Sequence, residues 1–384
     1  MSSILILTLD SGGGHLAAAQ AIAAALERRY GSAVHTRVAD LSKEVESGPL
    51  RKSHETYQWL AGNHPRLYGW LWHRNWFLTG SEFVAVLCRL LAGRTLTKIY
   101  QSEQPDVVVS VHGLLNHFPE RLLRTTVSGS VPFVTVITDM LSFHRLWINP
   151  AVDYCIVATE QARDLAVRYG LAPERVEVLG QPVHPRFAER RSGKEHARRE
   201  LGLDLQRPCV LITSGGDGIG RLYETARAVA GCVPALQLIV VAGRNQALQQ
   251  RLLSTAWEVP ARIYGFADNM PDLMGASDLV VTKAGPGTLA EAFAMGLPVI
   301  VSSYIPGQES ENPQYVVEGG AGIYLEDPVE IAGTIREWIA DSGQLRRMAA
   351  NAGKLARPQA SLRIAERLFQ LFQPEKAISL PKRE

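Results

Sequence analysis

The chain has 384 residues, more than one typical domain, so its length predicts two domains of about 150–200 residues. Its formal net charge of +2 at pH 7 argues against a dedicated nucleic-acid-binding protein, although a local basic patch could still face anionic lipid. No apolar run approaches the roughly 20 residues of a membrane-spanning helix. The first apolar run lacks the basic flank of a signal peptide, and the four scattered cysteines form no CxxC pair. We therefore expect a cytoplasmic protein with free thiols.

Short apolar runs alternate with helical patterns through the first half of the chain. The expected strands are residues 4–9, 34–38, 106–111, 133–137, 155–158 and 176–179, and the expected helices are residues 16–30 and 160–169. This alternation is typical of a doubly wound parallel sheet. The charged stretch 186–199 has no β character, so we interpret it as an interdomain connector that runs into a helix.

A second series of the same kind follows. Its expected strands are residues 210–213, 238–242, 262–264, 279–281, 299–301 and 323–325, and its expected helices are 222–230, 246–254, 288–295, one that begins at 329 and one that ends near 372. The predicted fold class is therefore α/β, with two Rossmann-like, doubly wound parallel-sheet domains. We expect an N-terminal domain at residues 1–186 and a C-terminal domain at 187–355. Residues 356–384 would hold a helix that could cross back to the first domain, plus a polar tail.

A glycine-rich turn, Asp10-Ser-Gly-Gly-Gly-His15, follows the first strand and opens the first helix. In open α/β sheets ligands bind at such carboxyl ends of strands, so the backbone at Gly14 could approach a ligand. His15 is a candidate general base, because imidazole titrates near neutrality. Two alternatives stay open. One is a plain tight turn with a structural histidine, and the other is a dinucleotide-binding pattern over Gly12–Ala17 with Asp40 as its ribose acid.

Two further glycine-rich turns lie in the second half. Ser214–Gly220 follows a strand and precedes a helix, and its backbone N–H groups suit a diphosphate, unless it is only a flexible turn. Gly285 and Gly287 precede a helix expected to open at Thr288, where unpaired N–H groups and the helix dipole favour phosphate. Glu291 lies one turn further on and could accept hydrogen bonds from ribose hydroxyls. The chain has no GxxxxGK[ST] P-loop.

Two other strand ends carry weaker signals. Asp139 ends a strand, with His144 and Trp147 shortly after it, and its carboxylate could orient an acceptor or a base. A helix cap is the alternative interpretation of Asp139. Gln308 and Glu309 place an amide and a carboxylate side by side, which suits the hydroxyls of a sugar, although on composition alone a surface turn is the simpler interpretation.

The stretch Tyr57–Phe83 is aromatic, with four of the chain's seven tryptophans and several basic neighbours. Trp70, Trp72 and Trp76 in this setting are typical of a helix at the membrane–water interface. One alternative is a helical hairpin packed inside its own domain. Another is a surface that stacks RNA bases, which the overall charge disfavours.

Four segments are specific enough to identify a family: Lys283–Glu291, Gly296–Pro298, Tyr304–Glu309 and Tyr315–Val317. On these segments the chain resembles monogalactosyldiacylglycerol synthases and the related bacterial diacylglycerol glucosyltransferases of glycosyltransferase family 28. The likeness covers nearly the whole chain. The isolated glycine-rich turns on their own are not specific.

The resemblance implies the GT-B fold, in which two Rossmann-like domains face each other across a cleft and the C-terminal one holds a UDP-sugar. It implies that Phe266 contacts uracil through its backbone and that His15 lies beside the acceptor hydroxyl. The diphosphate would meet Gly287 and Thr288, and the ribose would meet Glu291. The full candidate set is His15 and Asp139 as catalytic residues; Gly14, Gly216, Arg244, Phe266, Lys283, Gly285, Gly287, Thr288, Glu291, Gln308 and Glu309 as donor-binding residues; and His144, Trp147, Trp70, Trp72 and Trp76 as acceptor- or membrane-facing residues.

We therefore expect an inverting hexosyltransferase, independent of metal and cofactor, that moves galactose or glucose from a UDP-sugar to the hydroxyl of a lipid, most simply 1,2-diacylglycerol. It would bind the anionic inner face of the cell membrane peripherally and no nucleic acid. The loop Thr138–Trp147 departs from the plant galactolipid enzymes, so the acceptor stays open, as does the oligomeric state. The alternatives are transfer to a polyprenol-linked or isoprenoid alcohol, a UDP-GlcNAc 2-epimerase, a dinucleotide oxidoreductase and a non-catalytic lipid-surface module.

Overall fold

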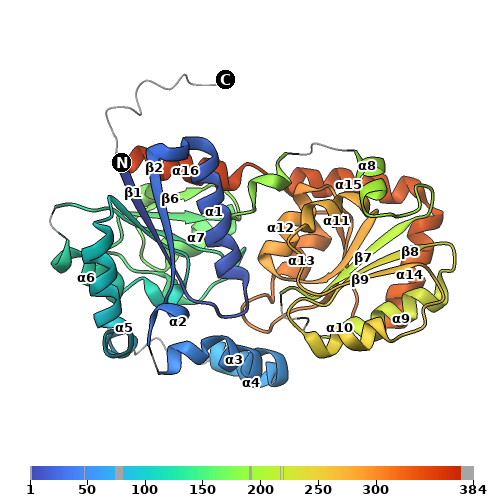
Figure 1. Ribbon diagram of the computed structural model, residues 1–384, viewed down its shortest axis with the longest axis horizontal. Helices are drawn as coiled ribbons and strands as arrows, with labels where there is room; N and C mark the ends of the chain where they lie inside the picture. Colours follow the sequence, from blue (N-terminus) through green and yellow to red (C-terminus); the bar gives the residue numbers. More distant parts are fainter. Residues whose placement is uncertain are drawn as a thin grey trace. The chain divides into compact units, whose positions relative to one another are not determined.

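The computed structural model describes residues 2–46, 48–73, 81–127, 129–189, 193–216, 218 and 220–372. The chain forms two compact units. Unit 1 comprises Met1–Leu60, Arg66–Pro185 and Gln359–Glu384, and unit 2 comprises Ala61–Pro65 and Arg186–Pro358. Each unit contains one six-stranded parallel sheet with helices packed against it, which confirms the predicted α/β class (Figure 1).

The sheet of unit 1 has the strand order β2-β1-β3-β4-β5-β6, and all neighbouring strands are parallel. Its strands are β1 (Ser2–Thr8), β2 (Val34–Asp40), β3 (Val107–Ser110), β4 (Phe133–Val136), β5 (Tyr154–Val157) and β6 (Val176–Val178). Each coincides with a predicted apolar run. The second strand, β2, lies on one side of β1, and β3 to β6 follow one another on the other side. The order in which strands join the sheet therefore reverses at β1. Open α/β sheets bind ligands at this kind of reversal point.

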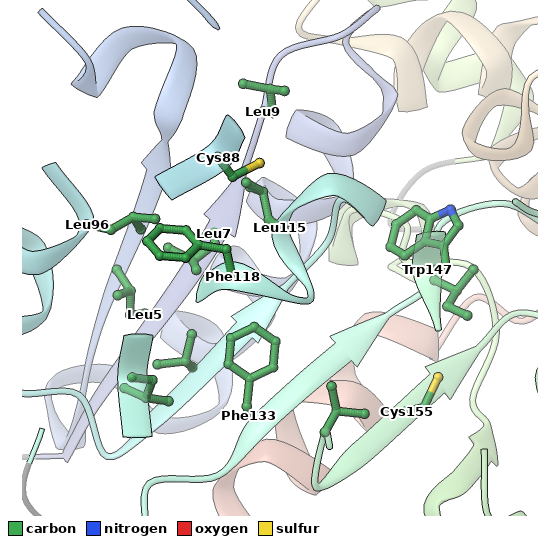
Figure 2. Close-up of a cluster of buried hydrophobic side chains, with 14 of the residues drawn as sticks. Leu5, Leu7, Leu9, Cys88, Leu96, Leu115, Phe118, Phe133, Trp147 and Cys155 are labelled. Carbon is green, nitrogen blue, oxygen red and sulfur yellow. The ribbon is translucent and has the colours of Figure 1, made fainter. Parts of the chain in front are cut away.

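The side chains of β1 alternate between two hydrophobic layers, as expected for a strand buried on both faces. Leu5 and Leu7 enter one layer, where Figure 2 shows them beside Phe118, and Ile4 and Ile6 enter the other. All four β1 side chains are fully buried. The first layer is covered by α5 (Ser81–Glu103), α6 (Phe118–Thr126) and α7 (Glu160–Arg168), and the second by α1 (Gly14–Tyr30) and α16 (Ala360–Phe372).

Helix α16 follows unit 2 in the chain but packs on α1 in unit 1 (Figure 1). The rings of Tyr30 and Phe369 stack with centroids 4.1 Å apart. Arg367 forms a two-pronged ion pair with Glu177 of β6, at 2.7 and 2.8 Å, and Leu368 is fully buried. An apolar stripe and a fixed ion pair therefore hold this last helix on the first sheet.

The sheet of unit 2 has the order β12-β11-β10-β7-β8-β9, again all parallel, and its direction of addition reverses at β7. Its strands are β7 (Cys209–Thr213), β8 (Gln237–Val241), β9 (Ala261–Tyr264), β10 (Leu279–Lys283), β11 (Val299–Ser303) and β12 (Gly322–Tyr324). Its helices are α8 (Lys194–Glu200), α9 (Leu222–Cys232), α10 (Gln246–Leu253), α11 (Met270–Ala276), α12 (Pro286–Ala294), α13 (Asn312–Glu318), α14 (Pro328–Ala340) and α15 (Ser342–Leu355). Helix α9 packs on α14, α8 on α11, and α12 on α15.

Four helices of unit 2 differ from the sequence prediction: α12 begins earlier than expected, and α11, α13 and α15 were not predicted. Helix α12 begins at Pro286 rather than Thr288, because proline suits the first helical position, where no backbone N–H is needed. Helix α15 lies in a stretch without a predicted element. Its buried residues Met348 and Ala352, with Leu345 packed on the same core, lie at helical spacing, so this helix was detectable from sequence.

The described residues of the aromatic stretch after β2 are helical. The stretch follows α2 (Leu41–Glu44) and contains α3 (Ser53–Tyr57), a π-helical turn (Gln58–Asn63) and α4 (Pro65–His73), and α5 comes after it. Trp76, one of the predicted membrane-facing residues, lies outside the described residues. Across the described ranges, no helix has the length and apolar character that a membrane span requires.

Candidate active site

In unit 1 the glycine-rich turn lies at the reversal point of the sheet. It follows β1, and β1 is paired with β3. Gly12 and Gly13 have φ values of 103° and 83°, a left-handed conformation that glycine adopts without strain. The turn is fixed by Asp10, whose Oδ1 accepts the backbone N–H of Gly13 at 3.1 Å. Helix α1 then begins at Gly14, so that His15 is its second residue.

The half-buried His15 imidazole lies against groups that follow neighbouring strands. Its Nδ1 lies 2.7 Å from Oγ1 of Thr138, after β4, and its ring centroid lies 4.6 Å from that of His112, after β3. Burial lowers the pKa of His15 to about 4, although a hydrogen bond with the backbone of Val111 and the charge of Asp10 act in the opposite direction. The imidazole is therefore neutral at pH 7 and can accept a proton.

Asp139, the other predicted catalytic residue, is directed to a tryptophan. Its Oδ2 accepts the indole N–H of Trp147 at 2.7 Å, and both side chains are nearly fully buried. Trp147 ends a short 3-10 helix (Arg145–Trp147) that is capped by His144, whose Nδ1 accepts a backbone N–H at 3.2 Å. The ring of Trp147 lies 5.8 Å from that of His15. Asp139 therefore fixes the position of the Trp147 ring beside His15.

Helix α3 is fastened to the glycine-rich turn by three contacts. The Ser53 hydroxyl donates to the carbonyl of Asp10 at 3.0 Å, and His54 Nδ1 lies 3.4 Å from the Asp10 carboxylate. The ring of Tyr57 lies against Gly12 so closely that a Cβ there would come within 2.6 Å of it. The start of the aromatic stretch is therefore in direct contact with the turn that carries His15.

The aromatic stretch continues from this contact as a chain of rings. Tyr57 and Tyr68 have centroids 5.9 Å apart, Tyr68 and Trp72 6.0 Å, and Trp72 and His144 5.5 Å. The predicted residues Trp72 and His144 are thus brought together. Trp70 differs from Trp72, since 48% of its surface is exposed.

Gly12→Ala is expected to lower the free energy of unfolding of unit 1 by about 1–3 kcal/mol, because alanine at this φ is strained and its methyl group meets Tyr57. Gly14→Ala is the matched control, since Gly14 begins a helix and a Cβ there meets no atom within 4 Å. Chemical denaturation of both variants measures the difference. Equal stability of the two variants would contradict the strained turn.

In unit 2 two glycine-rich turns also leave adjacent strands at a reversal point, because β7 is paired with β10. A Cβ added to Gly215 would lie 3.1 Å from Lys283 Cε, and one added to Gly285 would lie 3.0 Å from Lys283 Nζ. The lysine side chain therefore lies between the two turns. Asp217 and Ile219 of the first turn lie outside the described residues.

The start of α12 has the features of an anion site. Its N-cap residue, Gly285, provides no side-chain cap for the first backbone N–H groups. A Cβ on Gly287 would meet no atom within 4 Å, so the backbone there is open to approach. Thr288 is half-buried in the same first turn. Open N–H groups at the positive end of a helix dipole suit a phosphate.

Glu309 is bound to groups of its own unit. Only 2% of the residue is exposed. Its Oε1 pairs with the Lys283 ammonium group, and its Oε2 accepts the backbone N–H of Ile305 at 2.9 Å. Gln308, beside it, is half-buried. Glu309 thus fixes both Lys283 and the loop that presents Gln308.

Phe266 and Arg244 form a second predicted pair in unit 2. Phe266 is 58% exposed, and the guanidinium carbon of Arg244 lies 5.2 Å from its ring centroid, a cation–π arrangement. The backbone N–H of Arg244 donates to the carbonyl of Gly216 at 2.7 Å. An exposed aromatic ring and a cation are therefore tied to the glycine-rich turn after β7.

Glu291 lies on α12, one turn beyond the N-terminus of that helix, where a phosphate could bind. Part of its surface is exposed, yet burial raises the pKa of its carboxyl to about 8. At neutral pH this carboxyl is mostly protonated when no ligand is present. No cluster of three or more His, Cys, Asp or Glu that could hold a metal ion occurs among the described residues.

Sequence reasoning did not single out His112, whose ring packs against His15, or Ser11, whose hydroxyl lies 3.0 Å from Nε2 of His112. Attention to the residue after every predicted strand, and not only to glycine-rich turns, would have found His112. The structure also gives Asp40 a local role. Its Oδ1 accepts N–H groups of Asp10 and Ser42, so it caps α2 and braces the turn.

Two six-stranded parallel sheets, each with glycine-rich turns at its reversal point, place the chain in the GT-B fold class. Solved structures share this fold over the whole chain. HepE of Anabaena, solved with UDP-glucose, has a TM-score of 0.55 at 19% identity and covers 99% of this chain and 100% of its own. The UDP-GlcNAc 2-epimerase of Neisseria meningitidis has a TM-score of 0.61 at 14% identity, with 96% and 100% covered. Since transferases and epimerases share this fold, the fold alone does not choose between them.

Sequence comparison makes that choice. Residues 15–183 match the model of monogalactosyldiacylglycerol (MGDG) synthase, and residues 209–364 match that of the glycosyltransferase family 28 C-terminal domain. The probable monogalactosyldiacylglycerol synthase 2 of Oryza sativa subsp. japonica is 38% identical, over 97% of this chain and 81% of its own. The monogalactosyldiacylglycerol synthase of Spinacia oleracea is 37% identical, over 96% and 72%.

The chain belongs to the monogalactosyldiacylglycerol synthase family, which confirms the resemblance read from its motifs. It is an enzyme, a glycosyltransferase that acts on lipid. This membership excludes the oxidoreductase and non-catalytic interpretations.

The expected localisation at the inner face of a cell membrane, in the cytoplasm, is wrong, because these relatives are chloroplastic proteins. The four cysteines are free, as expected, at Cys88, Cys155, Cys209 and Cys232. Free cysteines distinguish reducing from oxidising surroundings, but not one reducing compartment from another.

Proposed function

We propose that the enzyme transfers a hexose, galactose in the first instance, from a UDP-sugar to the hydroxyl of 1,2-diacylglycerol with inversion at the anomeric carbon. The observation that supports this most is the neutral, half-buried His15 at the reversal point of unit 1. The names of the family and of its relatives supply the lipid and the sugar.

His15 would act as the general base. As the acceptor oxygen bonds to the anomeric carbon, its proton passes to His15, and the bond from that carbon to the UDP oxygen breaks. UDP leaves with the electron pair. Desolvation of the half-buried ring keeps the imidazole neutral before this step, and Asp10 lies near enough to favour the imidazolium that the step produces.

The donor would be held in unit 2. The open start of α12 at Gly287 and Thr288 suits the diphosphate and its growing charge in the transition state. Lys283, between the two glycine-rich turns, adds a positive charge to that site. Glu291 would accept hydrogen bonds from the ribose hydroxyls, and Gln308 would form hydrogen bonds with the hydroxyls of the donor sugar. These groups stabilise the leaving UDP without a metal ion.

An assay that crosses UDP-galactose, UDP-glucose and UDP-GlcNAc with diacylglycerol and a polyprenol tests the proposal. Thin-layer chromatography should show one monohexosyl lipid with diacylglycerol and UDP-galactose as the best pair. Product formed only with polyprenol would refute the acceptor, and product formed only with UDP-glucose or UDP-GlcNAc would refute the sugar. A parallel incubation of UDP-GlcNAc without acceptor tests for epimerisation, which the proposal does not allow.

UDP-sugar affinity is expected to rise with pH by up to about tenfold per unit between roughly pH 6 and pH 8, because ribose binding needs the Glu291 carboxylate and its pKa is raised to about 8. UDP-galactose is the right probe, since its diphosphate has no terminal group that titrates near pH 6. In calorimetry across this range, the Glu291→Gln variant should bind UDP-galactose more weakly than the wild type, with an affinity that does not change with pH. A variant that keeps the wild-type slope would assign the titration to another group.

The aromatic stretch would dock the enzyme on its lipid substrate. Trp59, Leu67 and Trp70 are 54%, 43% and 48% exposed, and Arg66 is exposed beside them. Removing two tryptophans from a lipid interface costs several kcal/mol of apolar contact, so Trp59→Ser/Trp70→Ser should weaken sedimentation with anionic vesicles by more than about tenfold. Val329→Ser, at an exposed apolar residue of unit 2, is the matched control and should bind normally. Unchanged binding of the tryptophan variant would leave this surface without its proposed role.

A further inference from the structure

His112 has both of its ring nitrogens engaged. It is only 8% exposed, in the segment between β3 and a 3-10 helix (Gly113–Leu115). Its Nδ1 accepts the backbone N–H of Leu114 at 3.2 Å, which caps that short helix. An acceptor nitrogen carries no proton, so the proton of the neutral ring is on Nε2. The position of the ring in the fold therefore selects one tautomer.

This tautomer decides the direction of the next hydrogen bond. Nε2 of His112 lies 3.0 Å from Oγ of Ser11, and it donates. The Ser11 hydroxyl accepts this bond and retains its own hydrogen for donation. Ser11 belongs to the glycine-rich turn that ends at His15. A single side chain thus connects the end of β3 with the turn after β1, across the reversal point of the sheet.

His112 also packs against His15. The two rings meet edge to face, with an interplanar angle of 66°. Burial and the neighbouring His15 lower the pKa of His112 well below its usual value, so His112 stays neutral and does not compete for the proton that His15 accepts. The other groups around His15 are Thr138, Trp147 and the backbone of Val111, which carry no charge, and the Asp10 carboxylate, itself close to His54.

We propose that His112 is a positioning residue for glycosyl transfer, which seats the hydroxyl of Ser11 in the turn that carries His15 and keeps water from one side of the His15 ring. The proposal rests on the proposed role of His15 as the base. His112 itself takes no proton in the reaction, and its effect on the rate passes through Ser11 and His15.

Two substitutions separate the nitrogens of His112. His112→Asn retains an acceptor near the Nδ1 position, so it can still cap the 3-10 helix, but its amide NH₂ group is too short to reach Ser11 from the Nε2 side. His112→Gln can place an amide N–H near the Nε2 position, but it loses the cap. We expect His112→Asn to fold like the wild type and to lower kcat by about 10- to 100-fold, with an unchanged KM for the UDP-sugar. His112→Gln should retain more of the turnover despite a lower melting temperature.

The pH profile adds a readout that a purely structural role would not change. Water that enters beside the smaller asparagine relieves the desolvation of His15, so the acid limb of kcat should move up from about 4 toward the ordinary imidazole range. Ser11→Ala should lower kcat to a similar degree, and Ser11→Ala/His112→Asn should lose little more than either single variant.

Wild-type kcat and an unshifted acid limb in His112→Asn would overturn the proposal, as would strictly additive losses in the double variant. His15→Ala, measured in parallel, separates this failure from that of the proposed function. Full turnover of His15→Ala would refute the base, whereas a dead His15→Ala beside a fully active His112→Asn would refute only the positioning role.

Discussion

Replacing His15 with alanine is expected to lower kcat for lipid glycosylation by about 10²- to 10⁴-fold, the usual contribution of a positioned general base. The structure gives three reasons for this choice of residue. His15 begins a helix at the reversal point of the unit 1 sheet, its Nδ1 is held 2.7 Å from Thr138 Oγ1, and burial lowers its pKa to about 4. An imidazole that is already neutral at pH 7 needs no prior deprotonation to accept the acceptor's proton. In the wild type kcat should therefore fall only as the pH approaches about 4.

The substitution should affect chemistry and not donor binding. UDP affinity, measured by calorimetry, should be unchanged, because the proposed UDP-binding groups belong to unit 2. Free imidazole should restore part of the turnover, since the alanine leaves space for it. Thr138→Val, which removes the partner of Nδ1 but keeps the ring, should lose only about tenfold. Full activity of His15→Ala, or a loss explained entirely by weaker UDP binding, would contradict the role of the base.

The strands and the glycine-rich turns were predictable from sequence because their signals are local. An apolar run followed by Gly12 and Gly13, or by Gly285 and Gly287, is visible within a few residues, and a parallel sheet needs such runs at regular intervals. Strand order is different, since it depends on which strands pair over long separations. The pairing of β1 with β3 brings the segment at His112 next to the glycine-rich turn, although about 100 residues separate them in the chain.

The hydrogen-bond and ion-pair partners of the buried carboxylates could not be predicted from the sequence either. Asp139 and Glu309 could each be recognised as a carboxylate after a strand, but a carboxylate pattern does not say which donor occupies it. The structure directs Asp139 to the Trp147 indole and Glu309 to Lys283. Both carboxylates are almost fully buried, so each is satisfied by a group of its own unit. The sequence thus predicts where polar groups gather, and the packing decides what each of them holds.

Both units apply the same construction to different chemistry. In each, the first strand lies between two neighbours that are added in opposite directions, and glycine-rich turns open at that point. In unit 1 the neutral, hydrogen-bonded rings of His112 and Trp147 surround His15, which suits proton transfer from a lipid hydroxyl. Unit 2 fills its turns with backbone N–H groups and Lys283, which suits an anion. The proposed division of the reaction between base and leaving group therefore corresponds to different side chains at two equivalent points of the two sheets.

Breaking the buried pair of Lys283 and Glu309 is expected to lower the free energy of unfolding of unit 2 by about 3–5 kcal/mol in either single variant, Lys283→Met or Glu309→Gln, because each leaves an uncompensated charge. Their side chains are only 16% and 3% exposed. The double variant has no charge left to bury, so it should regain most of the lost stability. Arg227→Met/Glu258→Gln is the control cycle, with a pair at 2.8 Å whose side chains are 35% and 47% exposed, and its coupling should stay below about 1 kcal/mol.

The same three variants separate the structural role of the pair from its role in donor binding. If Lys283 meets the diphosphate, the Lys283→Met/Glu309→Gln protein should fold stably and still bind UDP at least about tenfold more weakly than the wild type, since a lost charge-assisted contact costs about 1.5–3 kcal/mol. Chemical denaturation and UDP calorimetry on the same samples measure both quantities. Recovery of UDP affinity together with stability would show that the pair only supports the loop. If the double variant instead folds stably but does not bind UDP, Lys283 is a residue that binds the UDP-sugar, and Glu309 holds it between the two glycine-rich turns.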